Sequence, residues 1–210
     1  MSSRPRWRML WSLGAAFATV SCAIAGVPSP SADSTDTTST PTSIRQTDDH
    51  GKELPFTTKF PDRWSANNDG TTYEPCTSLT DTELSALGVD PTTVKDVALA
   101  NHQTARGCIW SYRGRWMGGV SHFTGDKPTF EEEKKDRSWY EKSYDITIDG
   151  RLVLVDYWDS SRCITTVEVE HASVSTIVTR LWNPPPESEL CNLAIEFTKL
   201  TLPKMPPPAP

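Results

Sequence analysis

The sequence of 210 residues contains no uncharged apolar run long enough to cross a bilayer as a helix. The longest such run, MLWSLGAAFATV at residues 9–20, has 12 residues, whereas a membrane-spanning helix needs about 20. Three arginines, Arg4, Arg6 and Arg8, precede this run. A basic start followed by a short apolar stretch is typical of a signal peptide. We therefore expect an exported protein that no helix inserts through a membrane.

Positive charge is also scarce. The chain has 21 Lys and Arg against 27 Asp and Glu, a formal net charge of −6. Loss of the signal would remove three arginines and leave 18 basic against 27 acidic residues, or −9. Nucleic acid and anionic lipid headgroups repel such a chain. We expect no nucleic-acid partner, and we expect membrane attachment through acyl chains.

Cysteine is limited to five residues, an odd number for an exported chain. Cys22 stands apart from the others, and TVSC at residues 19–22 resembles a lipobox, in which the cysteine thiol takes a diacylglyceryl group. The alternative is plain secretion after cleavage near Ala25. Lipidation accounts for the unpaired thiol, because four cysteines then remain for pairing. We therefore expect a lipoprotein held on the outer face of the plasma membrane by acyl chains such as palmitate.

Four regions follow from composition. Residues 1–21 form the lipoprotein signal peptide. Residues 22–53 begin with the lipidated cysteine and are rich in Ser, Thr and Pro, so they bury too little apolar surface to fold and are expected to form a disordered tether. Residues 54–203 are long enough for one domain. Residues 204–210 are expected to be a disordered Pro-rich tail.

The domain is predicted to be α+β, with an antiparallel sheet of four to six strands packed on two or three helices. Thr80 and Glu83 form a capping-box pattern at the start of a helix. Charged residues from Pro128 to Lys142 favour a surface helix whose acidic start suits the helix dipole. The apolar residues Leu190, Leu193, Ala194 and Phe197 have helical spacing after three prolines.

The strongest local signal is the hairpin YDITIDGRLVLVDYW at residues 144–158. A two-residue Asp149-Gly150 turn fixes its register. One face, which carries Ile146, Ile148, Val153, Val155 and Tyr157, is predicted to be core. The other face carries Leu152, Leu154 and Trp158, which another element covers or which form an apolar surface patch.

The remaining cysteines, Cys76, Cys108, Cys163 and Cys191, are predicted to form two disulfides. Four cysteines allow three pairings. We favour Cys76–Cys108 and Cys163–Cys191, because each bond would tie a helix to a nearby strand. No two cysteines have the short spacing of a structural zinc site, so no metal is expected.

Several stretches together resemble a known family. They are WSANNDGTTYEPC and LTDTELSALGVDP, RGCIWSY, IDGRLV and CNLAIEFTKLTLPKMP. They span residues 64–205 and are similar to the actinobacterial DUF3558 lipoproteins in sequence, in cysteine order and in the preceding lipobox and tether. The resemblance implies a cell-envelope lipoprotein of Gram-positive, mycolate-type bacteria. The biochemical function of that family is uncharacterised, so it assigns no catalytic residue.

Catalytic motifs are missing. There is no Gly-x-Ser-x-Gly, and the four histidines are far apart in the sequence. We therefore expect a protein that is not an enzyme, without a cofactor, that binds an envelope protein, a cell-wall glycan or a lipid. Arg113, Arg115 and Trp116, at an expected hairpin tip, are the candidate binding surface. Two alternatives stay open, a cell-envelope hydrolase or transferase with a cryptic site and a structural accessory subunit of an envelope complex.

Overall fold

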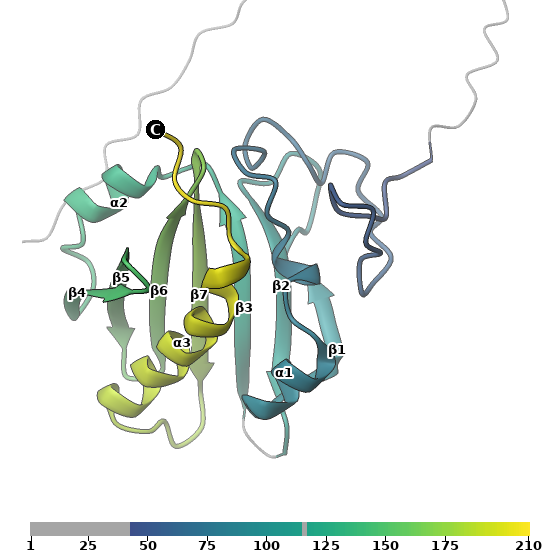
Figure 1. Ribbon diagram of the computed structural model, residues 1–210. Coiled ribbons are helices and arrows are strands. Elements are labelled where there is room, and N and C mark those ends of the chain that lie inside the picture. The colour runs from purple at the N-terminus through teal and green to yellow at the C-terminus, as the bar shows by residue number, and fades with distance from the viewer. Residues whose placement is uncertain (1–42, 115–116) are drawn as a thin grey trace, which may run out of the picture. The chain divides into compact units, whose positions relative to one another are not determined.

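The computed structural model describes residues 43–114 and 117–210. Their strands form one antiparallel sheet in the order β1-β2-β3-β7-β6-β5-β4 (Figure 1). The strands are β1 Val89–Asp96, β2 Ala105–Tyr112, β3 Gly118–Gly125, β4 Lys142–Ile148, β5 Arg151–Asp159, β6 Arg162–Val169 and β7 Ala172–Arg180. The helices are α1 Asp81–Ala86, α2 Phe130–Lys135 and α3 Glu187–Thr201, with 3-10 turns η1 Pro75–Thr77 and η2 Leu202–Lys204. The α+β class is confirmed.

The predicted strand count was too low, because the sheet has seven strands. Strand β1 (VDPTTVKD) was missed, since it is polar and contains Pro91. Proline is tolerated in this strand because β1 lies at the sheet edge, and its pairing with β2 is irregular between Asp90 and Lys95. Polar edge strands of this kind carry little sequence signal.

The hairpin of β4 and β5 forms as predicted. Ile148 pairs with Arg151 and Ile146 with Val153, which is the register set by a two-residue turn. Asp149 and Gly150 both have positive φ, 49° and 80°, as a type I′ turn requires. The register places Val153 and Val155 in the core on one face of the sheet.

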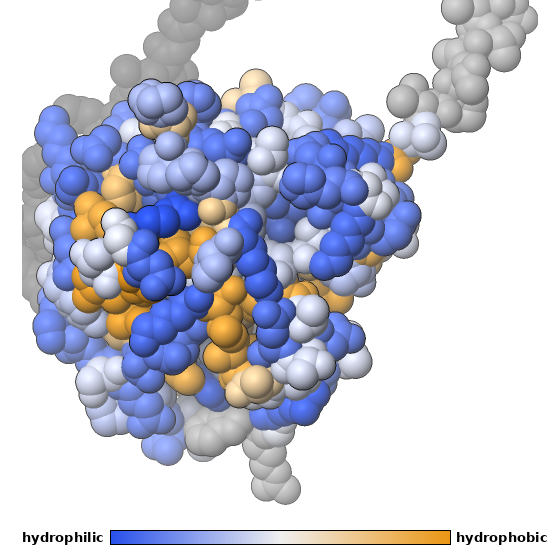
Figure 2. All heavy atoms as spheres, viewed as in Figure 1, coloured by the Kyte–Doolittle hydropathy of each residue, from blue (hydrophilic) through white to orange (hydrophobic). Residues whose placement is uncertain are grey.

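Helix α3 packs across that inner face (Figure 1). Its buried side chains include Leu190, Ala194 and Phe197, which confirms the predicted stripe. The Cys163–Cys191 disulfide bonds this helix to β6, with a Cα–Cα distance of 5.1 Å. In the space-filling view from the same side, hydrophilic residues dominate, and apolar ones reach the surface in short strips along α3 and near β4 (Figure 2).

The outer face of the sheet is covered in part by residues 126–141, here called the α2 segment, which connect β3 to β4. Phe130 on α2 is buried, and so is Leu154 of β5. Leu152 is half-buried, and Trp158 is 39% exposed. The prediction that this face is covered is therefore correct for Leu154 and only partly correct for Trp158.

Helix α2 is shorter than expected. It ends at Lys135 instead of Lys142, because Asp136 is extended and accepts hydrogen bonds from the backbone and hydroxyl of Ser138. The next residue, Arg137, then turns back onto the sheet and donates to Asp156 at 2.6 Å. A tertiary ion pair therefore ends the helix.

Residues on both sides of the expected domain, 54–203, make contacts with it. Residues 46–53 were assigned to the tether, but Asp48 is buried and accepts a hydrogen bond from Thr77 at 2.7 Å. Residues 204–210 were expected to be a free tail, but Pro208 forms a parallel bridge with Glu170. An extended Pro-rich segment can pair through its carbonyls and its one remaining N–H, and Ala209 donates to Glu170. No helix in the described ranges is long and apolar enough to span a membrane.

Candidate functional site

A groove with a volume of about 360 Å³ lies between the outer face of the sheet and the α2 segment. The sheet contributes Phe123, Trp158, Ile164, Ser175 and Ile177. The α2 segment contributes Pro128, Glu132, Glu133, Asp136, Trp139 and Tyr140. Side chains alternate between the two faces of a strand, so these sheet residues point away from α3. We call this hollow the aromatic groove, and its volume is in the range of small-molecule sites.

Three aromatic rings in series form one wall. The ring centroids of Trp139 and Tyr140 are 6.1 Å apart, and Tyr140 meets Trp158 edge-on at 6.1 Å and 84°. Trp139 is 74% exposed. Aromatic pairs favour such tilted and edge-to-face contacts. The wall thus has a fixed inner part and an outer ring open to solvent.

Carboxylates line the same groove. Glu133 is half-buried, and its Oε1 accepts hydrogen bonds from Tyr140 at 3.3 Å and Thr166 at 3.5 Å. Burial raises the pKa of Glu133 above its ordinary value, and the negative charge of Asp156 raises it further. Burial and the same two carboxylates also raise the pKa of Tyr140. Its phenol therefore stays protonated and donates to Glu133.

Arg137 fastens the α2 segment to the sheet. Its guanidinium donates to Asp156 and to Asp145, at 2.6 and 2.5 Å. It also donates to the carbonyls of Tyr144 and Val155, at 3.0 and 2.9 Å. Asp156 is fully buried, and its Oδ2 has no hydrogen-bond partner among the described residues. Buried acceptors are normally paired, so this oxygen leaves negative potential beneath the groove.

The chemistry of the lining favours binding. Ser175 lines the groove, but the described lining residues include no histidine, lysine or cysteine to activate it. Among the described residues, no group of three or more His, Cys, Asp and Glu is placed to hold a metal ion. What the groove offers is aromatic surface and negative charge.

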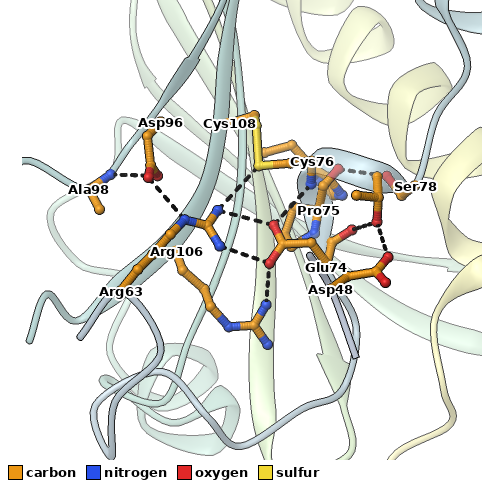
Figure 3. Close-up of a disulfide and its surroundings, with 12 residues drawn as sticks. Asp48, Arg63, Glu74, Pro75, Cys76, Ser78, Asp96, Ala98, Arg106 and Cys108 are labelled. Atoms are coloured by element: carbon orange, nitrogen blue, oxygen red, sulfur yellow. Dashed lines mark hydrogen bonds and ion pairs between the residues drawn. A yellow bond between two sulfur atoms is a disulfide. The ribbon is translucent and has the colours of Figure 1, made fainter. Parts of the chain in front are cut away.

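The most buried charges belong to a separate cluster beside the Cys76–Cys108 disulfide (Figure 3). Glu74 pairs with Arg63 at 2.9 Å and with Arg106 at 2.8 Å, and Asp96 pairs with Arg63 at 2.9 Å. Both arginines have no exposed surface. These groups satisfy one another and are closed to ligands, so the cluster holds the fold together.

The histidine in β3 is structural as well. His122 is fully buried, and its ring nitrogens lie 2.8 Å from the Tyr73 hydroxyl and 2.9 Å from the Thr176 hydroxyl. Burial lowers the pKa of the imidazole to about 3. It is therefore neutral at ordinary pH and has no path to a substrate.

Of the residues predicted from the sequence, the four cysteines form two disulfides, in the favoured pairing. Cys22, Arg115 and Trp116 lie outside the described residues. Arg113 is exposed and donates to the Ser85 hydroxyl at 2.7 Å. The binding surface at this hairpin tip remains a prediction.

An exposed apolar cluster lies beside that hairpin tip. The Leu181 amide donates to the Met117 carbonyl at 2.7 Å, and Trp182 follows directly. Their exposed fractions are 60% for Met117, 59% for Leu181 and 69% for Trp182. We call these three residues the apolar end. The sequence did not single them out.

Sequence reasoning missed the aromatic groove. Two signals in the sequence pointed to it. They are the Trp139-Tyr140 pair and the acidic run Glu131–Glu133 in α2. The sequence analysis placed both in one continuous surface helix. A helix that runs on to Lys142 spreads these residues around its axis. The groove exists because the chain leaves the helix at Asp136.

No curated protein and no solved structure matches the chain. A protein family described as a protein of unknown function, DUF3558, matches residues 17–204. This match includes all the strands and helices of the sheet domain, both disulfides and the aromatic groove. The chain belongs to the DUF3558 family.

Proposed function

We propose that this chain is an exported, membrane-anchored lipoprotein of the cell envelope, that it is not an enzyme, and that its folded domain binds a ligand in the aromatic groove. Export and anchoring rest on the apolar run at residues 9–20 and on Cys22 in its TVSC context. The binding role rests on one structural observation, the aromatic wall beside carboxylates in a hollow of small-molecule size. Contiguous exposed apolar surface with a polar rim commonly marks a ligand-binding groove.

Anchoring through Cys22 is tested by fractionation of cells that express the full chain. We expect wild-type protein in the membrane fraction, with an N-terminal peptide that carries acyl chains by mass spectrometry. Cys22→Ser should release the protein or retain its uncleaved signal. Anchoring at this residue would be contradicted if the wild-type chain carried no acyl chains and associated with the membrane as strongly as Cys22→Ser.

Binding in the groove is tested by extracting the full chain from membranes under native conditions and identifying co-purified small molecules by mass spectrometry. Trp158→Ala removes the inner ring of the wall, and Trp182→Ala is the matched control because Trp182 does not line the groove. We expect wild type and Trp182→Ala to carry the same ligand and Trp158→Ala to lose it. Equal recovery from all three would place the ligand elsewhere.

A hydrolase or transferase is the second candidate, and Glu133 is the observation that favours it. A half-buried carboxyl with a raised pKa is the usual form of a general acid. A glycosidase, however, needs a second carboxylate facing the substrate. The other two lining carboxylates each hold a local turn, because Glu132 accepts hydrogen bonds from Thr129 and Asp136 accepts hydrogen bonds from Ser138. Incubation with cell-wall fragments should therefore give no new products by mass spectrometry. Products that disappear with Glu133→Gln would favour the enzyme.

An accessory subunit that docks on another envelope protein is the remaining alternative. The apolar end, adjacent to Arg113, would be its contact surface. This reading predicts that Trp182→Ala, and not Trp158→Ala, abolishes the protein's function in the envelope.

A further inference from the structure

We propose that the aromatic groove binds a small organic cation through an alkylated ammonium group. This inference rests on the proposed function, since it names the ligand of the same groove. The ammonium would lie against the Trp139–Tyr140–Trp158 wall, with its positive charge toward the carboxylates of the α2 segment.

Charge complementarity is the first argument. The described lining holds three acidic side chains, Glu132, Glu133 and Asp136, and no lysine, arginine or histidine. A cleft lined by charge of one sign concentrates ligands of the opposite sign. An anionic ligand such as a phosphate would meet these carboxylates with no cation among the lining residues to hold it.

Charges behind the lining do not reverse this sign. Two arginines lie near the groove. Arg162, whose guanidinium lies over the Trp158 ring, is paired with Asp159. Arg137 is committed to Asp145 and Asp156 at 2.5 and 2.6 Å. Asp145 and Asp156 therefore share the Arg137 guanidinium, and Asp156 Oδ2 has no hydrogen-bond partner in the part of the chain that the structure describes. The region beneath the groove is negative on balance.

The aromatic wall is the second argument. The face of a tryptophan or tyrosine ring attracts an alkylammonium or guanidinium group. Trp158 already does this within the protein, since the guanidinium of Arg162 lies 4.2 Å from its ring centroid. Trp139, at 74% exposure, presents its ring to solvent. Rings beside carboxylates are the recurring design of sites for quaternary ammonium ligands.

A neutral saccharide fits the lining less well. Sugars also lie on aromatic rings, but their hydroxyls need donors as well as acceptors. The groove offers mostly acceptors, because two of its hydroxyls already have partners. The Tyr140 hydroxyl donates to Glu133, and the buried Ser175 hydroxyl lies within hydrogen-bond distance, 3.1 Å, of the Thr166 hydroxyl. The volume of about 360 Å³ favours a small free ligand.

The test is a titration of the full chain, held in a polyoxyethylene detergent that carries neither ammonium nor sugar groups. Choline is the probe, and 3,3-dimethylbutan-1-ol is its neutral isostere with the same shape. Binding is followed by saturation-transfer NMR of the probe. We expect choline to bind and the isostere to bind about tenfold more weakly or not at all, because only the charged probe gains the attraction to rings and carboxylates.

Variants locate the site. Trp139→Ala changes an exposed ring and should fold normally, and it should weaken choline binding by roughly three- to fivefold. Asp136→Asn should weaken it in the same direction. Trp182→Ala, outside the groove, should leave it unchanged.

Four results would overturn the assignment. Equal binding of choline and its isostere would show that charge is not recognised. Binding of chitotriose without choline would overturn the cation and leave the groove as a saccharide site, so the proposed function would stand. Binding of short-chain phosphatidylcholine, below its micelle concentration, without free choline would replace the free ligand by a lipid headgroup. If no probe binds and no ligand co-purifies with the native chain, both this inference and the proposed groove function fail.

Discussion

Glu74→Gln removes one negative charge from the centre of the buried cluster beside the Cys76–Cys108 disulfide (Figure 3). In the native protein, Glu74 and Asp96 balance Arg63 and Arg106. Glutamine has nearly the same size as glutamate, so the change leaves no cavity. It leaves one uncompensated positive charge among side chains with no exposed surface.

The expected loss follows from the contacts. Glu74 accepts four hydrogen bonds, at 2.9 and 3.1 Å from Arg63, 2.8 Å from Arg106 and 3.2 Å from the Cys76 amide. A glutamine accepts through one oxygen and turns an N–H toward a guanidinium. Breaking a buried ion pair from one side costs about 3–5 kcal/mol, because the partner stays buried and unpaired. With a urea m-value of about 2 kcal/mol/M, the unfolding midpoint should fall by roughly 1.5–2.5 M.

The assay is equilibrium urea unfolding with both disulfides intact, followed by tryptophan fluorescence. Glu196→Gln is the matched control, because Glu196 pairs with Lys199 at the surface, where the two side chains are 44% and 48% exposed. Such a pair contributes at most about 0.5 kcal/mol. If Glu74→Gln costs no more than the control, the buried charge cluster does not stabilise the fold.

Three further changes test other parts of the structure. Below pH 6.5, His122 binds a proton in the unfolded chain but not in the folded chain, where its pKa is about 3. The free energy of unfolding should therefore fall by up to about 1.4 kcal/mol per pH unit as the pH drops from 6.5 to 3. In urea titrations at several pH values, His122→Gln should remove this part of the pH dependence. An unchanged slope would mean that the imidazole is not held neutral. Replacing both Cys163 and Cys191 by alanine opens a loop with a sequence separation of 28. It should lower the free energy of unfolding by roughly 3–4 kcal/mol in the same unfolding assay. A loss below about 1 kcal/mol would contradict this prediction. Arg137→Ala strips Asp156 of its ion pair and should cost about 3 kcal/mol, with faster amide exchange in residues 130–141 and not in β6 or β7; unchanged exchange would show that Arg137 does not hold the α2 segment.

The parts of the fold that local chemistry determines were predictable from the sequence. Asp149-Gly150 fixed the hairpin register, because a two-residue turn with positive φ at both residues joins the strands directly. Thr80 and Glu83 formed the expected capping box. The disulfide pairing that the sequence analysis favoured, one of three possible, is the pairing in the structure.

The parts that depend on distant contacts were not predictable. Arg63 and Arg106 look like surface residues in the sequence, and only the folded chain brings Glu74 between them. Arg137 ends α2 through an aspartate 19 residues away. No local sequence pattern encodes that contact. The predicted helix was therefore too long, and the aromatic groove was not predicted.

The central claim is that a ligand occupies the aromatic groove in the living cell. A photo-crosslinking amino acid at position 139 places a reactive group on the groove wall, and the same amino acid at position 182 places it on the apolar end. Both positions are exposed, so both variants should fold. After illumination of cells and purification of the full chain, intact-mass spectrometry should show an adduct of small-molecule mass at position 139 and none at position 182. An adduct at position 182 alone, or a protein-sized adduct at position 139, would contradict the account.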